Sequence, residues 1–418
     1  MSFPTPLVAI VDAYSSGHLL PHWFRANGHD CVHVSSNDFV ERHLKGAFTP
    51  SDFCATLLYR GEFEQTVKEL QQFGVVAVVA GSETGVLLAD ALASRLDLPG
   101  NGMRRSAARR DKYLMSEALR ENGLDALRSC HVGSVDEGVS WARTLGRWPV
   151  VAKPCASAGG DSVQVCETEG ELARALESVI GRTNKIGVVN EGALVQEYVR
   201  GDVYSVNTVS CRGRHYVTHI WKYEKQGILY DHQYLIPFEG KVQSALTSYA
   251  SAVLDVMEIA YGPTHIEMIC RGDSPVVVDF GARLQGRNTP TLNRECTGIG
   301  QDELTADAYV DEESFRRKTA RPYHIFKYHM TVDFISKVEG RVASLDAFEA
   351  IKRLASYYLL HLNLKVGGEL QRTVDQFTSP GHVDLIHRDP QQLRRDLTTI
   401  RESEASGLYQ VEAAFETL

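Results

Sequence analysis

Residues 264–283 read THIEMICRGDSPVVVDFGAR, two apolar segments on either side of a short polar stretch. The two segments are typical of strands, and residues 271–275 have the composition of a hairpin turn. Each strand carries one acid, Glu267 or Asp279, and the second strand continues to Arg283. Mg²⁺ is usually held by one or two carboxylates together with substrate phosphates, and a guanidinium suits a phosphoryl oxygen or an oxyanion. The stretch therefore predicts a nucleotide-dependent enzyme.

The length of the hairpin loop decides whether the two acids meet. Side chains alternate along a strand, so directly opposed residues share a face. Glu267 lies opposite Asp279 only if the loop has an odd number of residues, three or five, because an even loop puts the acids on opposite faces. The alternative is that each acid is an ordinary polar-face residue of a half-exposed strand. Other parts of the chain must decide between the two.

Composition restricts the class of protein. A chain of 418 residues with 43% hydrophobic and 23% charged residues suits two or three globular units. No window is apolar enough to span a bilayer, and residues 1–6 do not resemble a signal peptide, so we expect a cytoplasmic protein without a membrane partner. The net charge of −9 argues against a nucleic-acid partner. Eight scattered cysteines indicate neither a disulfide framework nor a zinc cluster.

Strands alternate with helices in the N-terminal part, which favours a small parallel sheet with ligands at the carboxyl ends of its strands. Glu83 lies at such an end, in the sequence Gly81-Ser82-Glu83-Thr84-Gly85, where it either contacts a ligand or caps the next helix. A dinucleotide site at the Gly17 turn is excluded because GxGxxG is absent. The strands are predicted at 7–11, 31–34 and 75–80, and the helix at 86–96.

Periodicity extends these predictions along the chain. A hairpin over Gly367-Gly368 is predicted between strands at 362–366 and 369–374. Most of a basic run is interpreted as a solvated helix face; it comprises Arg104, Arg105, Arg109, Arg110 and Lys112. Helices are predicted at 111–120, 171–180, 244–260, 346–360 and 391–403, and strands at 148–154, 163–166, 193–199, 203–210 and 215–221.

Lys153 ends a predicted strand and precedes a loop of small residues, 155–162. Such a loop exposes backbone N–H groups to phosphate oxygens, and glycine permits close approach. Lys153 adds a positive charge for the phosphates, and Lys112 is a second candidate cation. The loop is not a Walker A motif, and a glycine-rich loop alone is more often a flexible hairpin.

Together these segments resemble the ATP-grasp superfamily of carboxylate–amine ligases, in the order of that family and over nearly the whole chain. The matching segments are 110–112 at the start of a helix, 151–154 with its small-residue loop, 196–206, 262–267 and 279–283, together with the turn at 81–85 and the glycine-rich hairpin near the C-terminus. The resemblance implies an α/β (α+β) ATP-grasp fold with ATP between the sheets. The implied parts are an N-terminal parallel α/β domain in 1–105, a central subdomain in 106–200 with a lid loop at 155–162, and a C-terminal antiparallel-sheet domain in 201–418 with a terminal subdomain from about 320.

The resemblance also implies a role for each candidate residue. Arg283 would be catalytic, and Glu267 and Asp279 would hold Mg²⁺, for which Mn²⁺ can substitute. Contacts to ATP are implied for Lys112, Lys153, Ser157, Gly159, Gly160, Glu197, Tyr198, Val199 and Asp202. Contacts to substrate are implied for Glu83 with an ammonium group, for His265 with a carboxylate and for Arg287 with the free carboxylate of the second amino acid.

Two positions depart from the family pattern. The family commonly has Glu-x-Asn-x-Arg where this chain has Asp279-Phe280-Gly281-Ala282-Arg283, so the metal-binding asparagine is replaced by Gly281. Gln285 or Asn288 would have to take its place, or one metal position is weakened. Val203 stands where an acid often binds the ribose, and Asp202 would substitute for it.

Within the superfamily the chain is most similar to the L-amino acid ligases of the bacilysin-synthetase type. This similarity implies that ATP phosphorylates one amino acid and that a second amino acid attacks, giving a dipeptide, ADP and phosphate. It fits an antimetabolite pathway of the tabtoxin kind and a homodimer. Two alternatives stay open. One is a biotin-carboxylase-like enzyme that activates bicarbonate. The other is an ATP-binding regulatory protein that has lost catalysis, and Gly281 and Val203 support this second alternative.

Overall fold

The structure is a computed structural model that describes residues 5–37, 48–157, 159–227, 229–286 and 289–412. The chain divides into two compact units, each described here by itself. The first unit holds residues 1–158, 162–220 and 238–323, and the second holds 159–161, 221–237 and 324–418.

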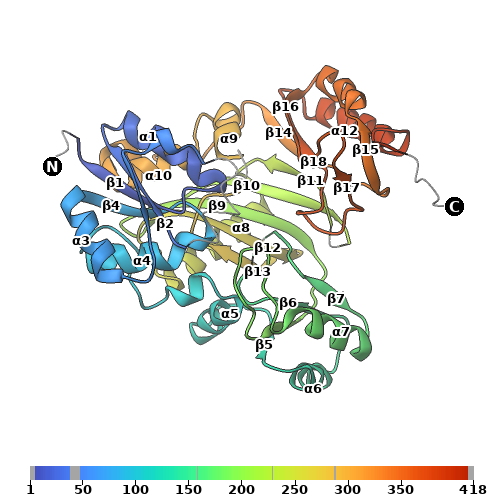
Figure 1. Ribbon diagram of the computed structural model, residues 1–418, viewed down its shortest axis with the longest axis horizontal. Helices are drawn as coiled ribbons and strands as arrows, with labels where there is room; N and C mark the ends of the chain where they lie inside the picture. The colour runs from blue at the N-terminus through green and yellow to red at the C-terminus, as the bar shows by residue number, and fades with distance from the viewer. Residues whose placement is uncertain (1–4, 38–47, 158, 228, 287–288, 413–418) are drawn as a thin grey trace. The chain divides into compact units, whose positions relative to one another are not determined.

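The N-terminal part of the first unit is a parallel sheet with the strand order β3-β2-β1-β4. Its apolar strands are covered on both faces, as parallel sheets require. α3 and α4 cover one face through Leu70 and Leu92, and α1 and α10 cover the other through Phe24 and Ala306 (Figure 1). The bounds are β1 Leu7–Val11, β2 Asp30–Ser35, β3 Ala55–Leu58, β4 Val75–Ala80, α1 Leu20–Ala26, α3 Phe63–Phe73, α4 Val86–Arg95 and α10 Gln301–Val310. The predicted parallel sheet is confirmed, although β3 and α3 were not predicted.

The central part of the first unit is an antiparallel sheet with the order β5-β8-β6-β7. α6 and α7 cover one face, where Ala142 and Leu176 pack on Val150 and Val195. Lys153 follows Ala152 of that core and therefore points to the opposite face. The bounds are α5 Lys112–Glu121, β5 Ser129–Val132, α6 Val135–Leu145, β6 Val150–Lys153, β7 Gln164–Cys166, α7 Glu169–Val179 and β8 Ala193–Glu197.

A second antiparallel sheet in the first unit has the order β13-β12-β9-β10. α10 and α11 pack on it, where Leu304 and Phe315 contact Val209 and Tyr216. β10 continues into the second unit. The bounds are β9 Asp202–Cys211, β10 Arg214–Gln226, α8 Lys241–Val256, β12 Gly262–Arg271, β13 Ser274–Gly281, α9 Thr289–Thr297 and α11 Glu312–Lys318.

The β12–β13 hairpin differs from the prediction in its turn. Arg271 pairs with Ser274, so the turn has two residues, Gly272 and Asp273, instead of an odd number. Gly272 has φ +61° at the first turn position, as a type II′ turn requires. An even turn alone would put the acids on opposite faces, but the register shifts by one residue between Glu267 and Met268. This β-bulge leaves Val278 as the extra residue and sets Glu267 opposite Asp279.

The second unit continues from β10 with the strand order β10-β11-β14-β18-β16, and it adds a small sheet of order β17-β15-β19. α12 packs on this part through Leu393 and Ile400, which contact Val332 and Leu385. The bounds are β11 Leu229–Ile236, β14 Tyr328–Asp333, β15 Gly340–Ser344, β16 Tyr357–Leu362, β17 Glu369–Leu370, β18 Gly381–His387, α12 Pro390–Ala405 and β19 Gln410–Val411.

Two predictions in the second unit were wrong. The helix predicted at 346–360 is a short 3₁₀ helix, Asp346–Arg353, followed by β16. Buried Phe348 and Ile351 are three residues apart, which suits a 3₁₀ helix, and the aromatic and leucine residues after 356 favour a strand. The hairpin over Gly367-Gly368 does not form, because β16 pairs with β18 while β17 pairs with β15.

The described part of the chain contains no helix that is both long and apolar enough to cross a membrane.

Candidate functional site

Two carboxylates face each other on neighbouring strands at the centre of the candidate site. Glu267 of β12 is directly opposite Asp279 of β13 on one side and Ser205 of β9 on the other. Opposed residues share a face, so the three side chains form one polar row. Ser205 Oγ is buried and has no hydrogen-bond partner in the structure. A buried hydroxyl without a partner is costly, so this row is suited to a polar occupant.

Two lysines contact the second strand of this row. Lys112, the first residue of α5, places Nζ 2.9 Å from Asp279 Oδ1. Lys153 Nζ donates to the carbonyl of Val278, the bulge residue, at 3.3 Å. Burial would raise the pKa of Asp279, but Lys112, Lys153 and Arg283 hold it at about 2. Asp279 is therefore an anion throughout the neutral pH range.

The local sequence places Lys112 through the cap of its helix. Asp111 is the N-cap of α5, and its carboxylate accepts from the N–H groups of Tyr113 and Leu114 at 2.8 and 2.9 Å. The Lys112 N–H donates to the Cys155 carbonyl at 3.0 Å, and its Nζ is 3.3 Å from the Ser157 carbonyl. The helix start is thereby tied to the loop that follows β6.

Glu83 lies between two arginines. Arg283 Nε donates to Glu83 Oε2 at 2.7 Å, and Arg110 Nη1 donates to Glu83 Oε1. The three side chains are between 9 and 17% exposed, so water screens these pairs little. Burial raises the pKa of Glu83, but the two guanidinium groups bring it below its usual 4.5. Contact of Glu83 with a substrate ammonium stays a prediction.

Gly281 provides the space for this arrangement. A Cβ atom at residue 281 would lie 3.0 Å from Glu83 Oε2 and 3.2 Å from Arg283 Cζ. The side chain of the asparagine that is common in the family would therefore lie next to the Glu83–Arg283 ion pair in this chain. The amide oxygen of Gln285, which was considered as a substitute, accepts from Asn207 Nδ2 at 2.7 Å.

His265 is held by the same asparagine. Its Nδ1 is 2.8 Å from Asn207 Oδ1, and its Nε2 is 3.5 Å from Glu267 Oε1. Since Asn207 gives its amide N–H to Gln285, its oxygen faces the imidazole, and His265 Nδ1 is the donor. Nε2 is therefore directed at the acidic row.

The residues predicted to bind adenine and ribose lie at the end of β8 and the start of β9. Glu197 is buried, and its carboxylate accepts from the Arg128 N–H at 2.8 Å and contacts the Arg147 guanidinium. Val199 packs on Val276, whereas Tyr198 is half-buried. These contacts fix the chain beside β13. They leave adenine binding as a prediction.

The remaining predicted residues are more scattered. Asp202 is exposed at the start of β9 and accepts from the Tyr204 hydroxyl at 3.4 Å. Ser157 is buried in the first unit, whereas Gly159 and Gly160 belong to the second unit with positive φ angles. Arg287 lies outside the described residues, as does Asn288.

The basic run before α5 was interpreted incorrectly. Only Arg104, 79% exposed, is a solvated side chain. Arg109 is completely buried; it pairs with Asp90 at 2.8 Å and donates to the carbonyls of Gly102 and Met257. Arg110, which the sequence singled out only as part of a motif, is bound to Glu83. Charge alone does not reveal which members of such a run are buried.

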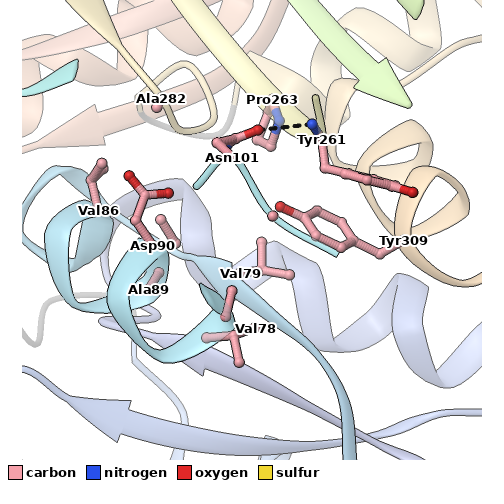
Figure 2. A pocket seen from close by; sticks show the side chains of 13 residues that line it. Val78, Val79, Val86, Ala89, Asp90, Asn101, Tyr261, Pro263, Ala282 and Tyr309 are labelled. Carbon is pink, nitrogen blue, oxygen red and sulfur yellow. Dashed lines mark hydrogen bonds between the residues drawn. The ribbon is translucent and has the colours of Figure 1, made fainter. Parts of the chain in front are cut away.

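Figure 2 shows a small pocket in the first unit. It is lined by Val79 and Asp90 of the N-terminal part and by Tyr261 and Tyr309, with the phenol of Tyr309 pointing inward. Asn101 at its rim accepts the Tyr261 N–H at 2.8 Å (Figure 2). Its volume of about 20 Å³ is room for a single water molecule. The pocket is too small for a nucleotide or an amino acid.

The donor set fits a hard divalent cation. The described residues provide the carboxylates of Glu267 and Asp279, and the contacts of Asp279 with Lys112 and the Phe280 N–H both use Oδ1. Two carboxylates leave positions for phosphate oxygens and water, which is the usual environment of Mg²⁺. No group of three or more acidic, histidine or cysteine ligands occurs among the described residues, so a site built from protein ligands alone is absent there.

The depressed pKa of Glu83 predicts a pH-dependent stability. A carboxyl group with a lowered folded-state pKa stabilises the fold above its unfolded pKa, and that contribution is lost as the pH falls below about 4.5. Glu83→Gln should therefore lower the melting temperature at pH 7, and the difference from wild type should narrow between pH 4.5 and 3. Scanning calorimetry across pH 3–8 measures this difference. Glu64→Gln, which removes an exposed pair with Arg95, should change little at any pH; a constant difference for Glu83→Gln would contradict the assignment.

Comparison with known proteins assigns the chain to a family. The ATP-grasp domain matches residues 146–291, and the chain belongs to the ATP-grasp ligases. Dapdiamide A synthase of Enterobacter agglomerans is 32% identical over 411 residues, which cover 96% of each chain. The predicted fold class is thereby confirmed.

Solved structures agree with this fold. The L-amino acid ligase of Bacillus licheniformis superposes with a TM-score of 0.75 at 17% identity, covering 96% of this chain and 98% of that one. The carboxyaminoimidazole ribonucleotide synthase of Aspergillus clavatus, solved with ATP, gives a TM-score of 0.70 at 12% identity and covers 96% of this chain and 99% of that one.

Proposed function

We propose that this chain is an ATP-dependent ligase that joins two amino acids into a dipeptide through an acyl phosphate and releases ADP and phosphate. The observation that carries the proposal is the pair of opposed carboxylates, Glu267 and Asp279, with Lys112, Lys153 and Arg283 around them. The similarity to dapdiamide A synthase over nearly the whole chain supports a synthase of this class.

The charge balance of the cluster suits a polyphosphate. Three carboxylates, those of Glu83, Glu267 and Asp279, are accompanied by four cations, those of Arg110, Lys112, Lys153 and Arg283. Phosphoryl transfer needs positioning and charge neutralisation more than covalent help from the protein. Lys112 and Lys153 are proposed to contact the phosphates, together with Ser157, Gly159 and Gly160. Glu197, Tyr198 and Val199 are proposed to border the adenine, and Asp202 the ribose.

Glu267 and Asp279 are proposed to hold Mg²⁺, which would supply charge neutralisation for the phosphates. The carboxylate of the first amino acid would take the phosphoryl group, and the amine of the second would attack the acyl carbon. Arg283 is proposed to face the oxyanion of that attack, because a guanidinium offers several fixed N–H donors. His265 is proposed to contact a substrate carboxylate, and Arg287 to bind the carboxylate of the second amino acid.

The test is pairwise incubation of the protein with ATP, Mg²⁺ and the twenty amino acids. Phosphate release and product mass are measured together. We expect ADP formation that requires amino acids, and a product mass equal to two amino acids less one water. Phosphate release that requires bicarbonate would instead indicate the biotin-carboxylase-like alternative. Nucleotide binding without turnover under any of these conditions would indicate the regulatory alternative.

A further inference from the structure

Arg283 is the proposed catalytic group, and two of its five N–H donors are already committed. Its Nε donates to Glu83 Oε2 at 2.7 Å and its Nη1 to the Leu284 carbonyl at 2.9 Å. Guanidinium hydrogen bonds are directional, so two fixed donors set the plane of the group. The orientation of the remaining N–H groups therefore depends on Glu83.

Glu83 is itself held from the other side. Its Oε1 accepts from Arg110, which lies two residues before Lys112 and is only 9% exposed. Glu83 follows β4 of the parallel sheet, in a 3₁₀ turn at residues 83–85. The carboxylate thus connects the sheet edge, the start of α5 and the end of β13. It is a fixed bridge between arginines rather than an open acceptor.

The absence of a side chain at residue 281 leaves space for the Glu83–Arg283 pair. Gly281 is not among the glycines with a positive φ, so the left-handed conformation does not explain why this residue is a glycine. Its missing Cβ is explained by space, since that atom would approach Glu83 Oε2 to 3.0 Å and the Arg283 guanidinium to 3.2 Å. Contacts this short force the neighbours to move by a few tenths of an ångström.

We propose that Glu83 is a positioning residue that aims Arg283 at the reacting centre, and that Gly281 is required because any side chain there would push this pair apart. The proposal rests on the proposed ligase function and adds a residue role to it. It also differs from contact of Glu83 with the substrate ammonium. A residue that binds the ammonium acts mainly on the KM of one amino acid, whereas a positioning residue acts on kcat.

The first test is steady-state kinetics of Glu83→Gln. We expect kcat to fall by about 10- to 100-fold, because a misplacement of about 1 Å costs this much, while the KM values for ATP and both amino acids stay within about twofold. Glu64→Gln is the matched control, because it removes an Arg–Glu pair at an exposed position. A raised KM for one amino acid with unchanged kcat would overturn the proposal in favour of ammonium binding.

The second test is a double-mutant cycle with Arg283→Lys. Residues that act through each other are not additive. We expect the double variant Glu83→Gln, Arg283→Lys to have the kcat of Arg283→Lys alone within about twofold. If the kcat losses of the two single variants multiply in the double variant, Glu83 does not act through Arg283, and the proposal is overturned.

Gly281→Ala covers the case in which Glu83→Gln does not fold, because it leaves all charges in place. It should lower kcat less than Glu83→Gln does, by about 3- to 10-fold, because the neighbours of residue 281 move by only a few tenths of an ångström. Gly133→Ala should leave kcat unchanged, since a Cβ there has Glu137 Oε2 as its nearest neighbour, at 3.7 Å. Wild-type kcat in Gly281→Ala would overturn the requirement for glycine.

Crystal structures of wild type and Gly281→Ala provide a readout that does not depend on turnover. We expect the Arg283 guanidinium to be displaced in the variant, and an unmoved group would overturn the proposal. If the wild type forms no ADP with any amino acid, the proposed function fails, while this comparison still tests the positioning.

Discussion

Arg283→Ala is expected to lower kcat by about 100- to 1,000-fold, the loss seen when one oxyanion-stabilising donor is removed. The guanidinium lies at the end of β13, is only 17% exposed and follows the acid–acid pair by four residues. Glu83 keeps its partner Arg110 in the variant, so no buried carboxylate is left without a cation. The measurement is amino-acid-dependent ADP formation, with circular dichroism to verify the fold.

Arg283→Lys separates charge from geometry. It retains the positive charge but has no planar set of N–H donors, so it should recover only part of the lost turnover. Turnover close to wild type in Arg283→Ala would contradict the assigned role. Equal loss in both variants would assign the effect to the fixed donor geometry.

Glu267→Gln is expected to raise the Mg²⁺ concentration needed for half-maximal turnover by at least about 10-fold. The carboxylate is half-buried opposite Asp279, and its replacement removes one of the two anionic ligands from the row. Measuring ADP formation against Mg²⁺ and Mn²⁺ concentration tests this. Asp273→Asn is the control, because Asp273 is an exposed acid of the same hairpin that pairs with Lys241. An unchanged metal dependence in Glu267→Gln would remove the metal assignment.

Local patterns predicted much of the first unit. The runs at Leu7–Val11 and Val75–Ala80 are wholly apolar, and each forms the strand predicted for it with the same bounds. Asp111 caps a helix with clear apolar spacing, which places Lys112. In these segments the backbone preference and the burial pattern agree, so a short window of sequence contains the information.

Other features depend on contacts that no short window contains. The bulge at Val278 reverses the effect of an even turn and is visible only in the register of the two strands. The Glu83–Arg283 pair joins residues 200 positions apart. Arg109 is buried and donates to the carbonyls of Gly102 and Met257, although it stands in a basic run of the sequence. In the second unit, β16 pairs with β18 and β17 pairs with β15, so the two segments of the wrong hairpin at 362–374 have partners elsewhere in the sequence.

The extra residue in β13 has a consequence for how this gene can change. The face of the sheet on which each side chain after Val278 lies depends on this one extra residue, because the register of the two strands shifts by one residue at the bulge. Deleting one residue at this position would therefore move Asp279 to the opposite face of the sheet, and the residues from Gly281 to Arg283 would change face with it. Substitutions in β13 can therefore be tolerated, whereas an insertion or deletion of one residue would separate the two opposed acids.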